Sequence, residues 1–205
     1  MSKPRGRPRQ YDEARALAGA IEVFWEKGFS ATSLDDLSSA MAMNRPSIYR
    51  AFGDKEAVYR RALAQFAVQM DEAFERTLEA QEDVRRGLAA FYREALAAYT
   101  AGPSPKGCLV LSTAVTAATS HLEIQSDLLE VIRRLDQRLE LRLQKAVGDG
   151  QLDESVDTKQ LAVLAQSVLH SLSLRARAGD SPVELRKLIA AGVDLLLPES
   201  VAPAG

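Results

Sequence analysis

The sequence contains one cysteine, Cys108, among 205 residues. A single cysteine excludes a disulfide within the chain and fits a reducing compartment. The chain also lacks an apolar run long enough to cross a bilayer, and no apolar stretch of the kind found in secretory signals follows its basic N-terminus. Its 46% hydrophobic and 26% charged residues are typical of a soluble globular protein. We therefore expect a cytoplasmic protein that makes no membrane contact.

The motifs of most enzymes are missing as well. The sequence shows no phosphate-binding glycine loop, dinucleotide fingerprint or nucleophile paired with a base. His121 and His170 are too isolated from other potential ligands to suggest a metal site. We expect neither catalysis nor a cofactor nor a bound metal.

Strand-like alternation is absent, and apolar residues recur instead at the three- and four-residue steps of helices. The first predicted helix carries Leu17, Ile21 and Phe24 on one side. Later helices are expected to start at about residues 33 and 54, to cover 45–52, 84–99, 108–119, 127–147 and 157–178, and to start again at 181. The expected fold class is all-α.

Local end signals support these helices. Gly28 and Gly53 are expected to stop the first and third helices, because glycine tolerates left-handed backbone at helix ends. Ser33 and Asp36 fit a capping box, in which each side chain bonds the other residue's backbone N–H. Asn44 is the expected N-cap of the third helix. The expected organisation is an arm (1–10), a three-helix DNA-binding domain (11–53), a larger helical ligand-binding and dimerisation domain (54–197) and a tail (198–205).

Charge is distributed unevenly along the chain. Residues 1–60 carry ten basic and eight acidic residues, whereas the remainder carries sixteen basic and twenty acidic residues. The first ten residues include Lys3, Arg5, Arg7 and Arg9 and no acid. This distribution indicates that any contact with a polyanion lies at the N-terminal end.

The second and third predicted helices are joined by only four residues, 41–44. This spacing is typical of a helix-turn-helix, whose second helix enters a DNA major groove, although an ordinary helical hairpin has the same spacing. Ile48 and Phe52 are expected to turn inward. The opposite surface of this helix is polar and comprises Arg45, Ser47, Tyr49 and Arg50. Arginine reads guanine edges with two hydrogen bonds, so these residue types favour DNA binding.

The arm contains Arg5-Gly6-Arg7-Pro8. An extended Arg-Gly-Arg segment with a proline fits the narrow minor groove of A·T-rich DNA, where the negative potential is strongest. We interpret Arg5 and Arg7 as minor-groove contacts, and the alternative is a solvated tail.

Two segments resemble the DNA-binding domain of the TetR/AcrR family of bacterial regulators. They are Gly28 to Ser33 (GFSATS) and Asn44 to Glu56 (NRPSIYRAFGDKE). The resemblance extends over residues 14–59. One departure is Ala42, where the family often has glycine in the turn. If residue 42 is left-handed, an alanine there costs about 1 kcal/mol.

The resemblance implies roles for particular side chains. Phosphate contacts are implied for Tyr49, Lys55 and either Thr32 or Ser33. A position toward the bases is implied for Arg45, Pro46, Ser47 and Arg50. It also implies a helical ligand-binding domain that pairs through its last two long helices.

The last two helices carry more apolar residues than one buried face needs. We predict a homodimer whose interface contains Leu164, Val168, Leu172, Leu185, Ile189, Gly192, Val193 and Leu196. The alternative is that both faces are internal to a monomer. A pair of helix-turn-helix units is normally needed to read a palindrome tightly.

A small-molecule effector is expected in the C-terminal domain. Candidate lining residues are Phe66, Met70, Phe91, Tyr92, Tyr99, Cys108 and Thr116, although each fits an ordinary core position equally well. Cys108 follows a loop at an expected helix N-terminus, which would favour the thiolate. The predicted function is therefore a repressor that an effector releases from a double-stranded DNA operator. The alternatives are a thiol-based sensor of oxidants or electrophiles acting through Cys108, and an architectural DNA-binding protein of low specificity.

Overall fold

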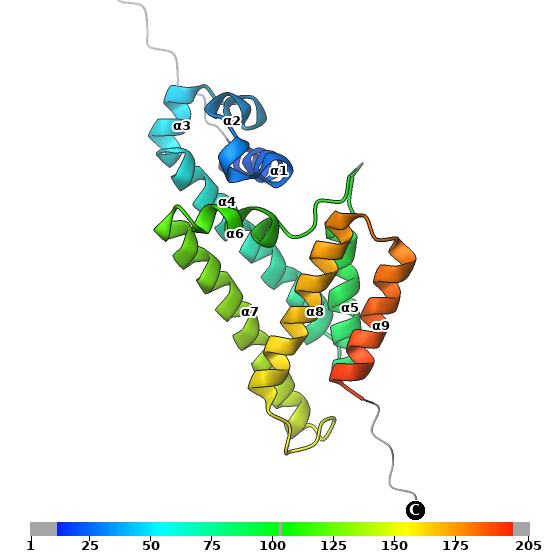
Figure 1. Ribbon diagram of the computed structural model, residues 1–205. Helices are drawn as coiled ribbons and strands as arrows, with labels where there is room; N and C mark the ends of the chain where they lie inside the picture. Colours follow the sequence, from blue (N-terminus) through cyan, green and yellow to red (C-terminus); the bar gives the residue numbers. More distant parts are fainter. Residues whose placement is uncertain (1–11, 103, 199–205) are drawn as a thin grey trace, which may run out of the picture. The chain divides into compact units, whose positions relative to one another are not determined.

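The computed structural model describes residues 12–102 and 104–198, and within these ranges every regular element is helical (Figure 1). The elements are α1 (Glu13–Ala31), α2 (Leu34–Ala40), α3 (Arg45–Phe52), α4 (Lys55–Phe74), the π-helix η1 (Glu75–Glu79), α5 (Val84–Tyr99), the π-helix η2 (Val110–Ala114), α6 (Val115–Ala118), α7 (Leu122–Gly148), α8 (Thr158–Ala178) and α9 (Pro182–Leu196). The all-α prediction is confirmed.

The chain divides into two compact units, unit 1 up to Ala62 and unit 2 from Leu63 onward. The division falls inside α4, so one continuous helix belongs to both units. Unit 1 contains α1 to α3 and the start of α4, and unit 2 contains the remaining helices.

The helices of unit 1 begin where short polar side chains cap them. Asp12, Ser33, Asn44 and Asp54 each accept a hydrogen bond from the backbone N–H three residues later, at 2.8–3.2 Å. Such bonds satisfy N–H groups that have no partner within the helix. The predicted capping box is confirmed, since the backbone N–H of Ser33 also donates to the Asp36 carboxylate.

Aromatic rings fill the core of unit 1. Tyr59 of α4 is fully buried, with its ring centroid 4.9 Å from that of Phe24 and 5.0 Å from that of Phe29. Phe29 reaches this position because α1 is interrupted at Gly28, whose φ of 78° and ψ of 171° are not helical. The predicted stop at Gly28 is thus a break that turns the last residues of α1 toward α4. On its other side α1 approaches α2 so closely that a Cβ on Gly19 would lie 2.1 Å from the carbonyl oxygen of Ala40.

In unit 2, α8 packs between α7 and α9, and α5 packs against both α8 and α9 (Figure 1). The core includes Phe74 and Phe91, whose ring centroids are 5.4 Å apart, and the fully buried Tyr92. Helix α7 begins at Leu122, earlier than the predicted start at residue 127. Leu122 itself is exposed, whereas Ile124 in the same first turn is fully buried and anchors this earlier start.

Two π-helical segments were not predicted. Each contains a buried threonine whose hydroxyl donates to the carbonyl four residues earlier, Thr77 to Ala73 at 2.6 Å and Thr113 to Leu109 at 2.7 Å. These bonds satisfy carbonyls that a wider π turn leaves unpaired by the usual backbone N–H.

Arg138 connects α7 to α4 and η1. Its guanidinium donates to the Asp71 carboxylate at 2.9 Å and to that of Glu79 at 2.8 Å, and lies 4.5 Å above the ring of Phe74. The charge is mostly shielded from water by these contacts, so α7 and α4 are held by a polar network as well as by apolar packing.

Candidate nucleic-acid interface and interior cavity

Helix α3 presents a polar surface over two buried anchors. Asn44 caps it, and Pro46 lies in its first turn, where proline removes no intrahelical hydrogen bond. Ile48 is fully buried and Phe52 nearly so, as predicted. On the opposite side Tyr49 keeps half of its surface exposed despite its large ring. The predicted contact residues Arg45, Pro46, Tyr49 and Arg50 are all exposed, and Ser47 is partly exposed.

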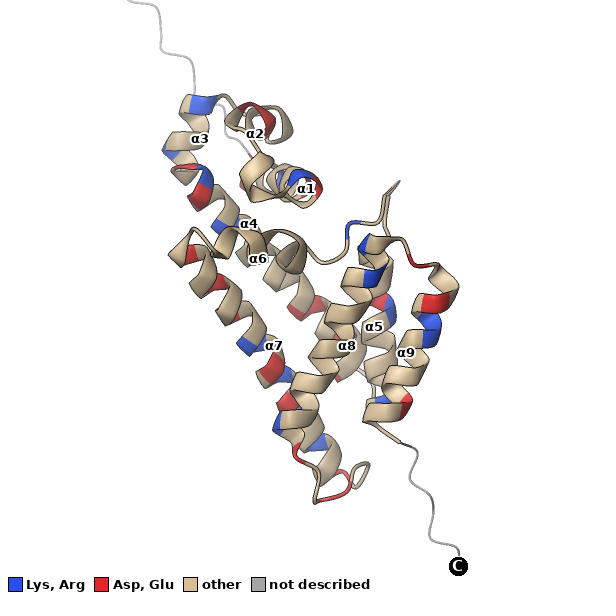
Figure 2. Ribbon diagram, in the orientation of Figure 1, with Lys and Arg blue, Asp and Glu red and all other residues tan. Residues whose placement is uncertain are grey.

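Basic residues lie along α3 and acidic residues on α2 (Figure 2). Arg45 is engaged by Asp35, with Nε to Oδ1 at 2.9 Å and Nη2 to Oδ2 at 2.5 Å. This hydrogen bond raises the pKa of the Arg45 guanidinium. Both side chains are more than half exposed, and exposed ion pairs of this kind contribute little net stability. The free-energy cost of breaking the Arg45–Asp35 ion pair, so that Arg45 can bind a phosphate or a guanine edge, is therefore small.

The two hydroxyl candidates differ in position. Thr32 is buried, and its Oγ1 donates to the carbonyl of Gly28 at 2.6 Å, so its side chain is unavailable to a phosphate. Ser33 is exposed and its hydroxyl contacts the carboxylate of Asp36 at 2.8 Å. Hydrogen bonds from Lys27 and Ser33 hold the pKa of Asp36 well below its ordinary value. Of the pair Thr32 or Ser33, only Ser33 has an exposed side chain.

Lys55 lies in a different environment from the one implied by the resemblance. Its ammonium donates to the carbonyl oxygens of Phe29 and Thr32 at 3.0 and 3.1 Å and lies 4.5 Å above the Phe29 ring. These carbonyls stand at the C-terminal end of α1, where a cation is favourable. Lys55 thus fastens α4 to α1, and one of its three N–H donors is left for another acceptor.

The turn between α2 and α3 is tight. Ala42 has a φ of 52°, and it is the one non-glycine residue with positive φ in the described part of the chain. The left-handed conformation considered from the sequence is therefore present. The turn is closed by the hydroxyl of Ser38, which donates to the carbonyl of Met43 at 2.5 Å. Arg5 and Arg7 of the predicted arm lie outside the described residues.

An interior cavity lies in unit 2 among α4, α5, η2, α7 and α8 and has a volume of about 20 Å³, enough for a single water molecule. Three of the predicted pocket residues line it, namely Met70, Tyr99 and Cys108. Buried or half-buried polar groups on α8, Gln166 and His170, line it as well. Neither residue was predicted to line a pocket, because a lone polar residue in an apolar helix gives no indication of which neighbours it faces.

The other predicted pocket residues lie elsewhere. Phe66, Phe91 and Tyr92 are buried core residues that do not line this cavity, and the hydroxyl of Tyr92 donates to the carbonyl of Ala165 at 2.7 Å. Thr116 is exposed. Its placement in a pocket was wrong, because the helical turn that carries it buries the neighbouring Ala117 instead.

The environment of Cys108 corrects one expectation. The thiol is buried, and desolvation raises its pKa, partly offset by backbone N–H groups of Leu111 and Val110 and by the Tyr99 hydroxyl. The N-terminal position therefore does not favour the thiolate, since burial outweighs the helix dipole.

The predicted interface residues fall into two groups. Leu164 is exposed, while Val168 and Leu196 are partly exposed. The other five, Leu172, Leu185, Ile189, Gly192 and Val193, are buried within one subunit. Gly192 allows close approach, but to Val168 of the same chain, whose Cγ1 would lie 2.9 Å from a Cβ at Gly192. The surface of these five residues is already buried within the subunit, where α9 packs against α5 and α8, so little of it is available to a second copy.

Two family models match the chain. Residues 16–62 match the model of bacterial regulatory proteins of the tetR family, and residues 84–191 match that of the tetracyclin repressor-like C-terminal domain. The chain belongs to the TetR family. It is therefore a transcriptional regulator rather than an enzyme, as predicted. Among the described residues of this TetR-family protein, no cluster of metal-binding side chains occurs and no helix is long and apolar enough to cross a membrane.

Relatives matched over most or part of the chain support this assignment. The chain is 29% identical to the HTH-type transcriptional repressor ComR of Escherichia coli over 98% of its own length and 96% of that protein. It is 30% identical to the repressor BdcR of the same organism over 54% of its length and 56% of that protein. A solved structure of the TetR-family regulator CifR, a cysteine mutant complexed with 26-bp operator DNA, matches with 31% identity and a TM-score of 0.84, covering 91% of this chain and 98% of that chain.

Proposed function

We propose that this TetR-family regulator is a cytoplasmic repressor that binds a palindromic operator as a homodimer and leaves it when a small molecule occupies unit 2. The observation that carries the DNA-binding part is the outward face of α3, where Tyr49 and Arg50 stand exposed above the buried anchors Ile48 and Phe52. Arg45, Pro46 and Ser47 are proposed to approach the bases, and Tyr49, Ser33 and the remaining donor of Lys55 to approach phosphates. Arg5 and Arg7 are proposed to enter the adjacent minor groove.

The relatives support the direction of regulation. ComR and BdcR are named as repressors, and a structure of a CifR cysteine mutant has been solved in complex with operator DNA. A repressor of this kind needs two α3 helices in successive major grooves, about 34 Å apart. Binding by one α3 alone forfeits half of the contacts.

The dimer is proposed to form through exposed apolar residues of α8 and α9. Leu164 on α8 is 54% exposed and Leu195 on α9 is 84% exposed, so both side chains are available for packing against a second copy. Val168 and Leu196, both partly exposed, lie beside them. Burying such side chains against a second copy contributes about 25 cal/mol for each Å² removed from water.

The effector is proposed to enter the interior cavity beside Tyr99, Gln166 and His170. Because the cavity holds about 20 Å³, any larger ligand must part η2 from α7 and α8. A shift of these helices that changes the spacing of the two α3 helices would break simultaneous contact with both grooves.

A titration of DNA affinity tests the proposal. The operator is first selected from the DNA flanking the gene, and Tyr49→Ala/Arg50→Ala is compared with wild type by fluorescence anisotropy at fixed salt. We expect at least about a hundredfold weaker binding, because each base or phosphate contact contributes roughly 1–3 kcal/mol. Arg133→Ala, which removes an exposed arginine from α7, is the control and should bind normally. Unchanged affinity of the double variant refutes the proposal, and equal affinity for random DNA favours the architectural alternative.

Sedimentation tests the dimer separately. Leu164→Glu/Leu195→Glu should sediment as a folded monomer and lose tight operator binding. Leu122→Glu, on a residue of α7 that is 81% exposed, should stay dimeric. A dimer that survives the double substitution would place the interface elsewhere.

A further inference from the structure

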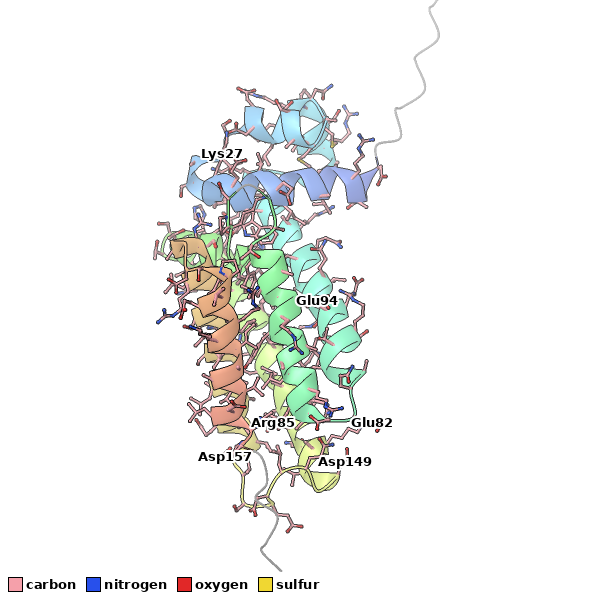
Figure 3. The ribbon with its side chains drawn as sticks, turned by 90° about the vertical axis from the view of Figure 1, so that its right-hand side faces the viewer. Lys27, Glu82, Arg85, Glu94, Asp149 and Asp157 are labelled. Atoms are coloured by element: carbon pink, nitrogen blue, oxygen red, sulfur yellow. The ribbon has the colours of Figure 1, made fainter. Side chains whose placement is uncertain are left out.

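A groove of about 360 Å³ runs between α5 and α9 on the surface of unit 2. Its lining combines small or apolar residues with four arginines: Arg85, Arg86, Ala89, Arg93, Arg186, Ile189, Ala190, Val193 and Asp194. The two helices lie side by side, with Arg85 near the start of α5 (Figure 3). Neither the interior cavity nor the α3 surface shares a residue with this groove.

The register of the two helices follows from one ion pair. Arg85, at the start of α5, donates to the carboxylate of Asp194, near the end of α9, at 2.6 Å. The helices are therefore antiparallel, and equal steps of 1.5 Å per residue place Ala89 level with Ala190 and Arg93 level with Arg186. The middle of the groove is floored by two alanines, and its far end is flanked by two arginines.

The charges of the groove are unbalanced. Arg85 is neutralised by Asp194, but Arg86, Arg93 and Arg186 form no ion pair within residues 12–102 and 104–198. In addition, the buried Nη1 of Arg85 has no hydrogen-bond acceptor there. Two facing guanidinium groups repel one another unless an anion lies between them. The groove could therefore bind a negatively charged group that accepts hydrogen bonds from these arginines.

The face that bears the groove is separate from the proposed dimer interface. At 100° per residue, Arg186 lies 180° and Ala190 lies 140° around α9 from Leu195, and Asp194 lies 100° from it. The groove stays open when Leu195 is covered by a second subunit.

We propose that this groove binds an amphipathic organic anion, with its carboxylate or phosphate between Arg93 and Arg186 and its apolar body over Ala89 and Ala190. Guanidinium groups bind both anions through paired hydrogen bonds. The volume falls within the range of small-molecule sites. The eight helical steps from Arg85 to Arg93 span about 12 Å, the length of a medium acyl chain. Ile189 and Val193 supply apolar walls that are already packed and need no rearrangement.

Calorimetric titration of the full-length protein with octanoate tests this site, with octyl phosphate as the second anion. Acetate lacks the apolar body and octanol lacks the charge, so each should bind at least about tenfold more weakly than octanoate. Arg93→Gln/Arg186→Gln removes the charge, and Ala190→Leu fills the floor while keeping every arginine. Arg133→Gln is the matched control on α7.

We expect both groove variants to weaken octanoate or octyl phosphate binding about tenfold or more, and the control to match wild type. Binding that persists in both groove variants would place the anion outside the groove and overturn the proposal. Failure of both anions to bind wild type at millimolar concentration, or equal affinity for octanol, also overturns it. Operator affinity without added anion should be the same in wild type and in both groove variants, so this test is independent of the repressor function.

Discussion

The two units differ in how far their polar side chains reach along the chain. In unit 1 the bonds that start helices join residues three apart, as from the N–H of Ser47 to Asn44. In unit 2 comparable bonds also cross the fold. The hydroxyl of Tyr92 reaches Ala165, the N–H of Val84 reaches Gln151, and the N–H of Cys108 reaches Ser173, over 65 to 73 residues.

This difference has a physical consequence. A cap is formed as soon as its helix forms, whereas a cross-chain bond is available only after distant helices have packed. Unit 1 therefore depends mainly on the close approach of its helices, although Lys55 also bonds carbonyls at the end of α1. Unit 2 depends more on donors that bond carbonyls of distant helices. Substitutions that remove one of these requirements should damage one unit and spare the other.

The largest effect is expected for Gly19→Ala in unit 1. The new Cβ would lie 2.1 Å from the carbonyl oxygen of Ala40, so α2 must move away from α1. We expect a loss of roughly 3 kcal/mol or more in the stability of unit 1, at the upper end for overpacking. Trp25, the single tryptophan, is buried in α1 and reports this unit by fluorescence during urea unfolding.

Gly148→Ala is the matched control, because nothing lies within 4 Å of a Cβ at that helical position. It should be neutral or slightly stabilising. A Gly19→Ala protein with an unchanged Trp25 transition would show that α1 and α2 are not held as closely as described.

The next largest effect is expected for Arg142→Met in unit 2. The buried guanidinium of Arg142 donates to the carbonyls of Leu78, Gln81 and Glu82 at 2.9–3.2 Å. Methionine keeps the apolar stem and removes the donors. Glu82 keeps a bond from Gln151, so two carbonyls are orphaned, which costs about 2 kcal/mol.

Far-UV circular dichroism during urea unfolding measures this change, since most helical residues belong to unit 2. Arg133→Met on the exposed side of α7 should leave the transition unchanged. If Arg142→Met is as stable as wild type, the desolvation cost of burying the guanidinium equals the stabilisation from its hydrogen bonds. Long-range polar bonds would then matter less for the stability of unit 2 than we propose.

The same contrast explains what the sequence predicted. The caps Ser33 and Asn44, the break at Gly28 and the inward face of Ile48 depend on residues close together in the chain, and all are present in the structure. The position of Lys55 against Phe29 and Thr32 could not be derived in this way, because its partners lie more than twenty residues away.

Unit 2 shows the limit more strongly. Apolar periodicity located its helices but could not separate residues that pack inside one subunit, such as Ile189, from those left for a partner, such as Leu195. The depth of Cys108 was likewise invisible, because burial depends on α8 packing over the segment that carries it.

The smallest effect is expected for Ala42→Gly, and it has the opposite sign. At a φ of 52° alanine is strained by roughly 1 kcal/mol, and glycine relieves this strain while adding freedom to the unfolded chain. We expect a net gain of up to about 1 kcal/mol in unit 1. Ala18→Gly, the same change at an exposed helical position of α1, should instead lose about 1 kcal/mol. Opposite shifts of the Trp25 unfolding midpoint would show that backbone strain at Ala42, in the turn between α2 and α3, lowers the stability of unit 1. A loss in both variants would show that the turn adapts to alanine without strain.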